Sequence, residues 1–279
     1  MNTKDKQKLL AYLKSQHLIF LASSSQNPWI ATLYFAVDDN FDIYFISESK
    51  SLHGKNILDN KKVSCGIADS KQKVNEEKIG VQLAGVASEI TDENEIRYAL
   101  ALWNASNPGL EKIINFDNLY KINTNVYIIR PTLIKFFNEK LYGQEGFRIL
   151  KNKIEAQFLF KGLIDLESLP DKSLNKYISV GYFKEKNPDG NPAYFYVHKV
   201  IVKGKTIDNA TRLLSKKLKK GWYAVFWNNN SSYFIFKNKI IKVSYNWTAD
   251  EFKKVTRYAT SVGIKNIHFL HIKKSMENW

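Results

Sequence analysis

Short apolar runs separated by polar turns fill the first 137 residues, and this alternation strongly restricts the folds open to the chain. Hairpin turns such as Asp38-Asp39-Asn40 join neighbouring runs. Short strands with such turns and few helices are typical of a small antiparallel barrel with peripheral helices. The pattern predicts strands at 18–23, 29–37, 41–46, 63–68, 79–90, 125–129 and 133–137, and helices at 3–16, 52–60 and 93–103.

The charge distribution predicts a second domain. Residues 1–150 hold 18 Lys and Arg against 17 Asp and Glu, whereas residues 151–279 hold 24 against 10. The net charge of +15 therefore comes almost entirely from the second half. A polar stretch at 139–153, with Gly143 and Gly146, is a predicted linker. We expect a barrel domain over 1–145 and a basic domain over 146–279.

The second half has an α+β pattern of its own. Its predicted strands cover 156–163, 177–184, 193–203, 222–227, 232–236, 240–243 and 267–272, and its predicted helices cover 206–219 and 248–262.

Several classes of protein are disfavoured. The one cysteine, Cys65, allows no internal disulfide, and its apolar neighbours predict a buried core residue. With so few cysteines and no clustered histidines, we expect no metal site. The first apolar run is too short for a signal segment, and no run approaches a membrane span. We expect a cytoplasmic protein that does not bind a membrane.

Four segments in order and spacing carry a family resemblance: Trp29–Asp39, Ile43–Ser47, His53–Asn60 and Val81–Ala87. Together they resemble the flavin-binding split β-barrels of the pyridoxamine 5′-phosphate oxidase family, and above all a small subgroup with an Ala-Thr-Leu-Tyr-Phe-Ala strand. The resemblance implies a homodimer with flavin mononucleotide (FMN) between the subunits and a small-molecule redox substrate. Other relatives bind deazaflavin or haem, and some have lost the cofactor.

The residues also suggest a phosphate site. The hydroxyls of Ser47, Ser49 and Ser51 precede a predicted helix, whose N-terminal amides favour an anion. Lys55 follows one turn into that helix. The ordinary alternative is an N-cap beside a solvated lysine. Further candidates for cofactor contacts are His53 and Asn56 on the helix, and Thr32, Leu33 and Gln82 on neighbouring strands.

Three further residues bear on this site. Related proteins often carry an arginine where this chain has Leu52, which leaves the phosphate site with one charge fewer. Trp29 and Trp103 are candidates for covering the flavin ring, with core or dimer packing as the alternative. No catalytic residue follows from the sequence.

The second half resembles an uncharacterised module of bacteria with reduced genomes, which transfers a fold and no activity. Its run Lys216–Lys220 is followed by Trp222, Tyr223, Phe226 and Trp227, a composition that suits nucleic acid. A solvated basic face with buried aromatics is the alternative. Three hypotheses follow. The chain is an FMN-dependent oxidoreductase with a basic module, or a non-catalytic dimeric split-barrel scaffold that carries a nucleic-acid-binding domain, or a relative that uses haem or deazaflavin.

Overall fold

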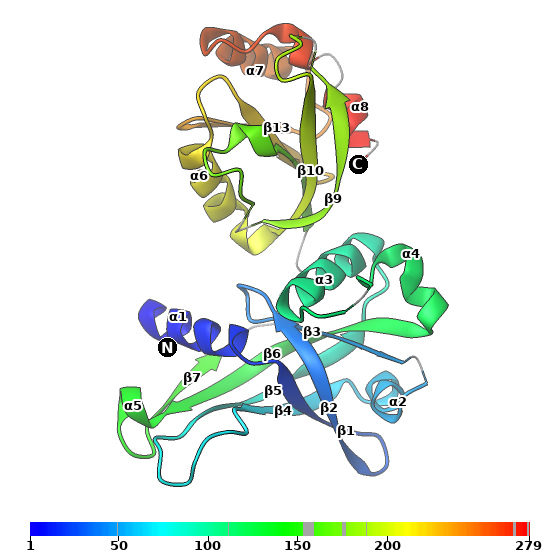
Figure 1. The fold of residues 1–279 in the computed structure, drawn as a ribbon, viewed down its shortest axis with the longest axis vertical. Coiled ribbons are helices and arrows are strands. Elements are labelled where there is room, and N and C mark those ends of the chain that lie inside the picture. The colour runs from blue at the N-terminus through cyan, green and yellow to red at the C-terminus, as the bar shows by residue number, and fades with distance from the viewer. Residues whose placement is uncertain are drawn as a thin grey trace. The chain divides into compact units, whose positions relative to one another are not determined.

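The computed structural model describes residues 1–279 except 49, 111, 153–158, 175–176, 188, 270–271 and 278. The chain forms two compact units, 1–155 and 156–279, which Figure 1 draws as separate bodies. The division falls ten residues later than the sequence boundary at 145, because the segment predicted as a linker contains α5 (Glu139–Tyr142) and β7 (Phe147–Lys151). Strand β7 pairs with the preceding strand of the first unit and so extends its sheet.

The first unit is a closed antiparallel barrel of six strands, which confirms the predicted fold. The strands follow the order β3-β2-β1-β4-β5-β6, and β3 pairs with β6 to close the ring. These strands are β1 (Leu18–Ser24), β2 (Pro28–Val37), β3 (Ile43–Glu48), β4 (Lys62–Ala68), β5 (Ile79–Glu89) and β6 (Thr124–Asn138). The interior is filled by inward-facing residues such as Leu21, Phe35, Phe45, Ile67 and Phe136.

Helices surround this barrel (Figure 1). They are α1 (Thr3–Lys14), α2 (Leu52–Asp59), α3 (Glu93–Ser106) and α4 (Phe116–Leu119), with a 3₁₀ turn η1 (Tyr120–Ile122). Leu9 and Leu13 of α1 pack into the barrel core, as their spacing on one helix face predicts. Trp103 of α3 donates a hydrogen bond from Nε1 to the carbonyl oxygen of Tyr34, 3.2 Å away, and fixes α3 to β2.

Strand β6 corrects the prediction of two strands hinged at Arg130-Pro131. It is one strand whose register against β5 shifts between Ala84 and Gly85. Gly85 lies opposite Pro131, and a Cβ at Gly85 would lie 2.7 Å from the carbonyl oxygen of Arg130. The irregularity is therefore accommodated by a glycine, and the strand continues through the proline.

The second unit is an α+β domain, as predicted. Its six antiparallel strands follow the order β13-β12-β11-β8-β10-β9. They are β8 (Leu159–Asp165), β9 (Ile178–Lys186), β10 (Tyr194–Lys203), β11 (Tyr223–Trp227), β12 (Ser231–Phe236) and β13 (Lys239–Ser244). The other elements are α6 (Ile207–Lys217), α7 (Ala249–Ser261), α8 (Ile272–Glu277) and the 3₁₀ turns η2 (Leu166–Ser168), η3 (Gly204–Thr206) and η4 (Asn266–Phe269).

Each face of this sheet has its own hydrophobic core. Leu214 of α6 packs on one face against residues such as Ile164 and Phe226. Residues of α7, η4 and α8 pack on the other face against Leu163 and Val225. The unit therefore has three layers, with helices on both sides of the sheet (Figure 1).

The predicted final strand at 267–272 is wrong, because η4 and α8 occupy this region around residues 270–271, which lie outside the described chain. Phe269, Ile272 and Met276 are buried, and their spacing of three and four residues is helical. Among the described residues, no helix combines the length and the apolar character that a membrane span needs.

Candidate functional site

The N-terminus of α2 gathers three of the predicted site residues. Ser51 is the N-cap, and its side chain accepts a hydrogen bond of 3.2 Å from the Gly54 amide. His53 Nε2 lies 2.7 Å from Ser47 Oγ and 3.2 Å from Ser51 Oγ, and the two hydroxyl oxygens lie 3.3 Å apart. The end of β3 and the first turn of α2 thus form one polar cluster. Ser49, the third predicted hydroxyl, lies outside the described residues.

A glycine shapes this cluster from the helix side. A Cβ at Gly54 would lie 2.8 Å from Tyr127 Oη and 2.9 Å from Ser51 Oγ, closer than side chains tolerate. The ring of Tyr127 is held in place by stacking on Phe45, with the ring centres 5.0 Å apart and the planes within 7°. Position 54 therefore requires glycine, because the hydroxyl groups of Tyr127 and Ser51 lie against the first turn of α2 at this point.

Lys55 contributes one positive charge near the N-terminus of α2. Burial lowers the pKa of His53, so the imidazole is neutral at pH 7 and contributes hydrogen bonds without charge. Lys55 lies one helical turn after Ser51, and its side chain is exposed. Leu52, at the position where the resemblance suggests arginine, is 48% exposed.

Asn56 has a structural role in this arrangement. Its side chain is buried, and Nδ2 donates a 3.2 Å hydrogen bond to Ser23 Oγ at the end of β1. Asn60 likewise donates to the carbonyl oxygen of Ser24. These two bonds anchor α2 to the β1–β2 hairpin. We therefore place Asn56 behind the polar cluster, where it orients the helix.

Thr32 and Gln82 lie elsewhere, on the outer wall of the barrel. Thr32 pairs with Phe20, Phe20 with Gly66, and Gly66 with Gln82, so these residues form one row across four strands. Their side chains face outward, and both Thr32 and Gln82 are exposed. Leu33 points to the opposite side and packs against the barrel core. The predicted set is thus divided between the α2 cluster and the outer wall.

The two tryptophans differ as well. Trp103 is buried and belongs to the packing of α3, whereas Trp29 is 46% exposed at the start of β2. Cys65 is buried, and burial raises the pKa of its thiol to about 12. It is therefore a protonated, unreactive core residue.

The donors at α2 match the chemistry of a phosphate group. Two hydroxyls, a neutral imidazole and a helix N-terminus offer hydrogen bonds, and Lys55 offers one positive charge. The outer wall offers a flat surface with apolar and polar side chains. In polarity these two regions suit a phosphate group and an aromatic ring.

In the second unit, the aromatic residues that suggested nucleic-acid binding are largely internal. Phe226 and Trp227 are buried in the two cores, and Tyr223 packs against Phe269 with ring centres 4.5 Å apart. Among the described residues of this unit, the exposed aromatics are three tyrosines that the sequence analysis missed: Tyr182, Tyr194 and Tyr196. Period-two alternation with lysines and a histidine in β9 and β10 is the signal that could have pointed to them.

Comparisons with known proteins agree with the barrel. The family model described as pyridoxamine 5′-phosphate oxidase matches residues 5–127. No curated protein matches the chain. A general stress protein 26 from Bacillus anthracis shares 18% identity, with 54% of this chain and 100% of that chain covered, at a TM-score of 0.40. An FAD binding protein from Mycobacterium smegmatis shares 19% identity, with 50% and 95% covered, at a TM-score of 0.37.

Proposed function

We propose that this protein, whose residues 5–127 match the family model described as pyridoxamine 5′-phosphate oxidase, binds flavin mononucleotide through its first unit and acts as an oxidoreductase. The observation that carries the proposal is the cluster of Ser47, Ser51 and His53 at the N-terminus of α2. Hydroxyl and imidazole groups at a helix N-terminus are suited to hold the flavin phosphate, with Lys55 as its counter-charge.

The outer wall of the barrel would hold the flavin ring. Thr32 and Gln82 supply polar groups in a row that also contains Phe20, and such a mixture suits a flat ring with a polar edge. When bound, the flavin supplies the redox chemistry, while the chain's residues bind and orient it. The substrate class is a small redox-active molecule.

The same wall supports a homodimer. Leu18, Phe20, Ile30 and Tyr34 are outward-facing on β1 and β2, and each is at least 41% exposed. A contiguous apolar area of this kind on a barrel wall is typical of a protein–protein interface. We propose that a second copy covers it and that the flavin lies between the two subunits.

Purified full-length protein tests this function through its visible absorption spectrum and an FMN titration. We expect FMN to bind and Lys55→Ala to weaken it at least tenfold, because a charge-assisted hydrogen bond contributes about 1.5–3 kcal/mol. Lys61→Ala, which removes an exposed lysine just after α2, is the matched control and should bind normally. A haem or deazaflavin spectrum would redirect the assignment to that cofactor, and failure to bind FMN would contradict the proposal.

A second candidate function uses the second unit. The pairs Tyr182–His198, Lys184–Tyr196 and Lys186–Tyr194 share one face of β9 and β10. We call the six residues of these three pairs the tyrosine strip. The ring centres of Tyr182 and Tyr196 lie 6.3 Å apart. Lys184 Nζ lies 4.2 Å from the centre of the Tyr194 ring. Exposed aromatic rings beside lysines suit single-stranded nucleic acid, because bases can stack on the rings while the lysines contact phosphates.

This second function is the alternative in which the barrel is a non-catalytic dimeric scaffold for a nucleic-acid-binding domain. It is compatible with flavin binding, because the α2 cluster and the tyrosine strip lie in different units.

A further inference from the structure

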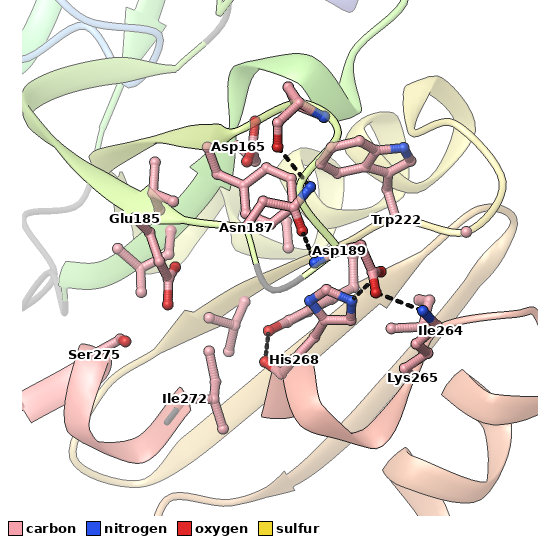
Figure 2. A pocket seen from close by; sticks show the side chains of 18 of the residues that line it. Asp165, Glu185, Asn187, Asp189, Trp222, Ile264, Lys265, His268, Ile272 and Ser275 are labelled. Carbon is pink, nitrogen blue, oxygen red and sulfur yellow. Dashed lines mark hydrogen bonds and ion pairs between the residues drawn. The ribbon is translucent and has the colours of Figure 1, made fainter. Parts of the chain in front are cut away.

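The second unit contains a cavity of about 650 Å³ on the sheet face that carries α7 and α8. Strands β8 to β11 line it on one side. The other side is lined by residues of 263–268 together with Ile272 and Ser275 of α8. Figure 2 shows Asp165, Glu185 and Trp222 around this space, with His268 and Ile272 from the helical side. The volume lies in the range of pockets that bind small organic molecules.

Strand register brings two carboxylates to this cavity. Val197 of β10 pairs with Asp165 of β8 on one side and with Phe183 of β9 on the other. Phe195, two residues earlier in β10, pairs with Glu185. Residues two apart in a strand share a face, so Asp165 and Glu185 face the same cavity. Together with Asp189, they are three of only ten acidic residues in 151–279.

Asp165 is a buried carboxylate with spare hydrogen-bonding capacity. Its side chain is more than nine-tenths buried, and Oδ1 accepts a 2.8 Å hydrogen bond from the Glu167 amide. Within the described residues, Asp165 makes no ion pair and Oδ2 accepts no hydrogen bond. Burial, together with the charges of Glu167 and Glu185, raises its pKa to about 6, although Lys219 opposes this shift. Oδ1 of Asp165 therefore caps the turn η2, whereas Oδ2 is left to interact with a ligand in the cavity.

The cations near the cavity are engaged elsewhere. Asp189 at the rim pairs with both Lys265 and His268. Lys186 is itself a lining residue of the cavity, but its side chain alternates with that of Glu185 along β9 and so points to the face of the tyrosine strip. Lys219 donates to the carbonyl oxygen of Glu167. In the described part of the chain, Glu185 has neither an ion pair nor a side-chain hydrogen bond.

Aromatic side chains form the walls beside these carboxylates. Trp222 meets Phe195 edge to face, with ring centres 5.5 Å apart and planes at 74°. Tyr223 donates from its hydroxyl to the carbonyl oxygen of His268, 2.9 Å away, which fixes its ring against η4. Aromatic faces combined with unpaired carboxylates attract an organic ammonium group by cation–π and ionic contacts.

We propose that this cavity binds a small organic cation, a protonated amine or guanidine whose apolar body packs against Trp222 and Phe195. The cationic group lies between Asp165 and Glu185 and contacts both carboxylates. Its positive charge reduces the repulsion between these two carboxylates, which face the same cavity. The proposal rests on the second unit and is independent of flavin binding.

Isothermal titration calorimetry on the full-length protein at pH 7.5 tests this site with phenethylamine and agmatine as probes. The neutral control is 2-phenylethanol, which matches phenethylamine in shape but lacks the charge. We expect at least one amine to bind, and the alcohol to bind at least tenfold more weakly than phenethylamine. Absence of binding by both amines at millimolar concentration, or equal binding of phenethylamine and the alcohol, would overturn the proposal.

Three variants locate the bound cation. Asp165→Asn and Glu185→Gln keep the side-chain size and should each weaken amine binding at least tenfold. Asp250→Asn removes an exposed carboxylate on α7 that does not line the cavity, and it should leave binding unchanged. Thermal unfolding of each variant confirms that it is folded. Unchanged binding in both cavity variants would show that the amine lies elsewhere, and the proposal would be wrong.

Discussion

At the scale of one residue, Asp165 is a carboxylate that lowers the stability of the folded second unit when it is ionised. In our proposal it is also a group that binds the cation. Its pKa is about 6 in the folded protein, whereas an unperturbed aspartate has a value of 3.8. The folded state therefore binds this proton more tightly than the unfolded chain does. Ionised Asp165 destabilises the fold above pH 6, and protonation relieves this cost as the pH falls from 6 towards 3.8.

We predict that Asp165→Asn stabilises the second unit at pH 7.5 by roughly 1–3 kcal/mol, and that this advantage shrinks towards pH 4. The charged or titratable groups that act on Asp165 are Glu167, Glu185, Lys219 and Tyr223. Urea unfolding at both pH values, followed by tryptophan fluorescence, measures the difference. Asp250→Asn is the control, and an advantage of Asp165→Asn that does not depend on pH would contradict the assignment.

The sequence shows that residues of the candidate site lie close together only where they are near neighbours in the chain. Ser47, Ser51 and His53 lie within seven residues, so the loop and the first helical turn bring them together. The contact between Asn56 and Ser23 could not be predicted, because the two residues lie 33 positions apart in the chain. Asp165 carried no signal in the sequence, since its burial depends on pairing with β10 more than 30 residues later.

At the scale of elements, the strands and helices with strong periodicity were predicted well, and the errors occur where tertiary contacts decide. The proline at 131 suggested a break in a strand that in fact continues opposite Gly85. The polar stretch 139–153 suggested a linker, but β7 finds hydrogen-bond partners on β6. The apolar run at 267–272 suggested a strand, although its buried residues follow a helical spacing.

The tyrosine strip gives a prediction for the pair β9 and β10. We expect Tyr196→Ala to weaken binding of a single-stranded oligothymidylate at least fivefold, because stacking on an aromatic ring contributes about 1–3 kcal/mol per base. Tyr196→Phe keeps the ring and should bind almost normally. Fluorescence anisotropy with labelled oligonucleotide measures both.

Lys184 of the same strip gives the electrostatic control. Lys184→Ala should reduce the slope of log K against log salt concentration by about one, the change expected when one phosphate contact is lost. If the wild-type protein does not bind the oligonucleotide, or if Tyr196→Ala binds as tightly as the wild type, the strip is a solvated surface and the second candidate function fails.

At the scale of the whole molecule, the net charge is distributed unevenly between the two units. The first unit is nearly neutral and carries the exposed apolar wall, whereas the second carries almost all of the net charge of +15. A neutral apolar wall favours contact with a second copy of the chain, because like charges do not oppose it. A strongly basic unit favours anionic partners, while its acidic cavity selects a cation by short-range contacts.

The wall makes the oligomeric state a test of the flavin proposal. Ile30 is 66% exposed on β2 and pairs with Ala22 in the outward-facing set. We predict that the wild-type protein has twice the 32.3 kDa mass of one chain and that Ile30→Asp is monomeric, because a buried carboxylate in an apolar interface is costly. Light scattering after gel filtration measures the mass.

Since the flavin would lie between the subunits, Ile30→Asp should also lose FMN affinity. Val74→Asp, at a position 97% exposed in the loop after β4, should change neither property. A monomeric wild-type protein that binds FMN would refute the proposal that the flavin lies between two subunits. It would not contradict phosphate binding at the α2 cluster.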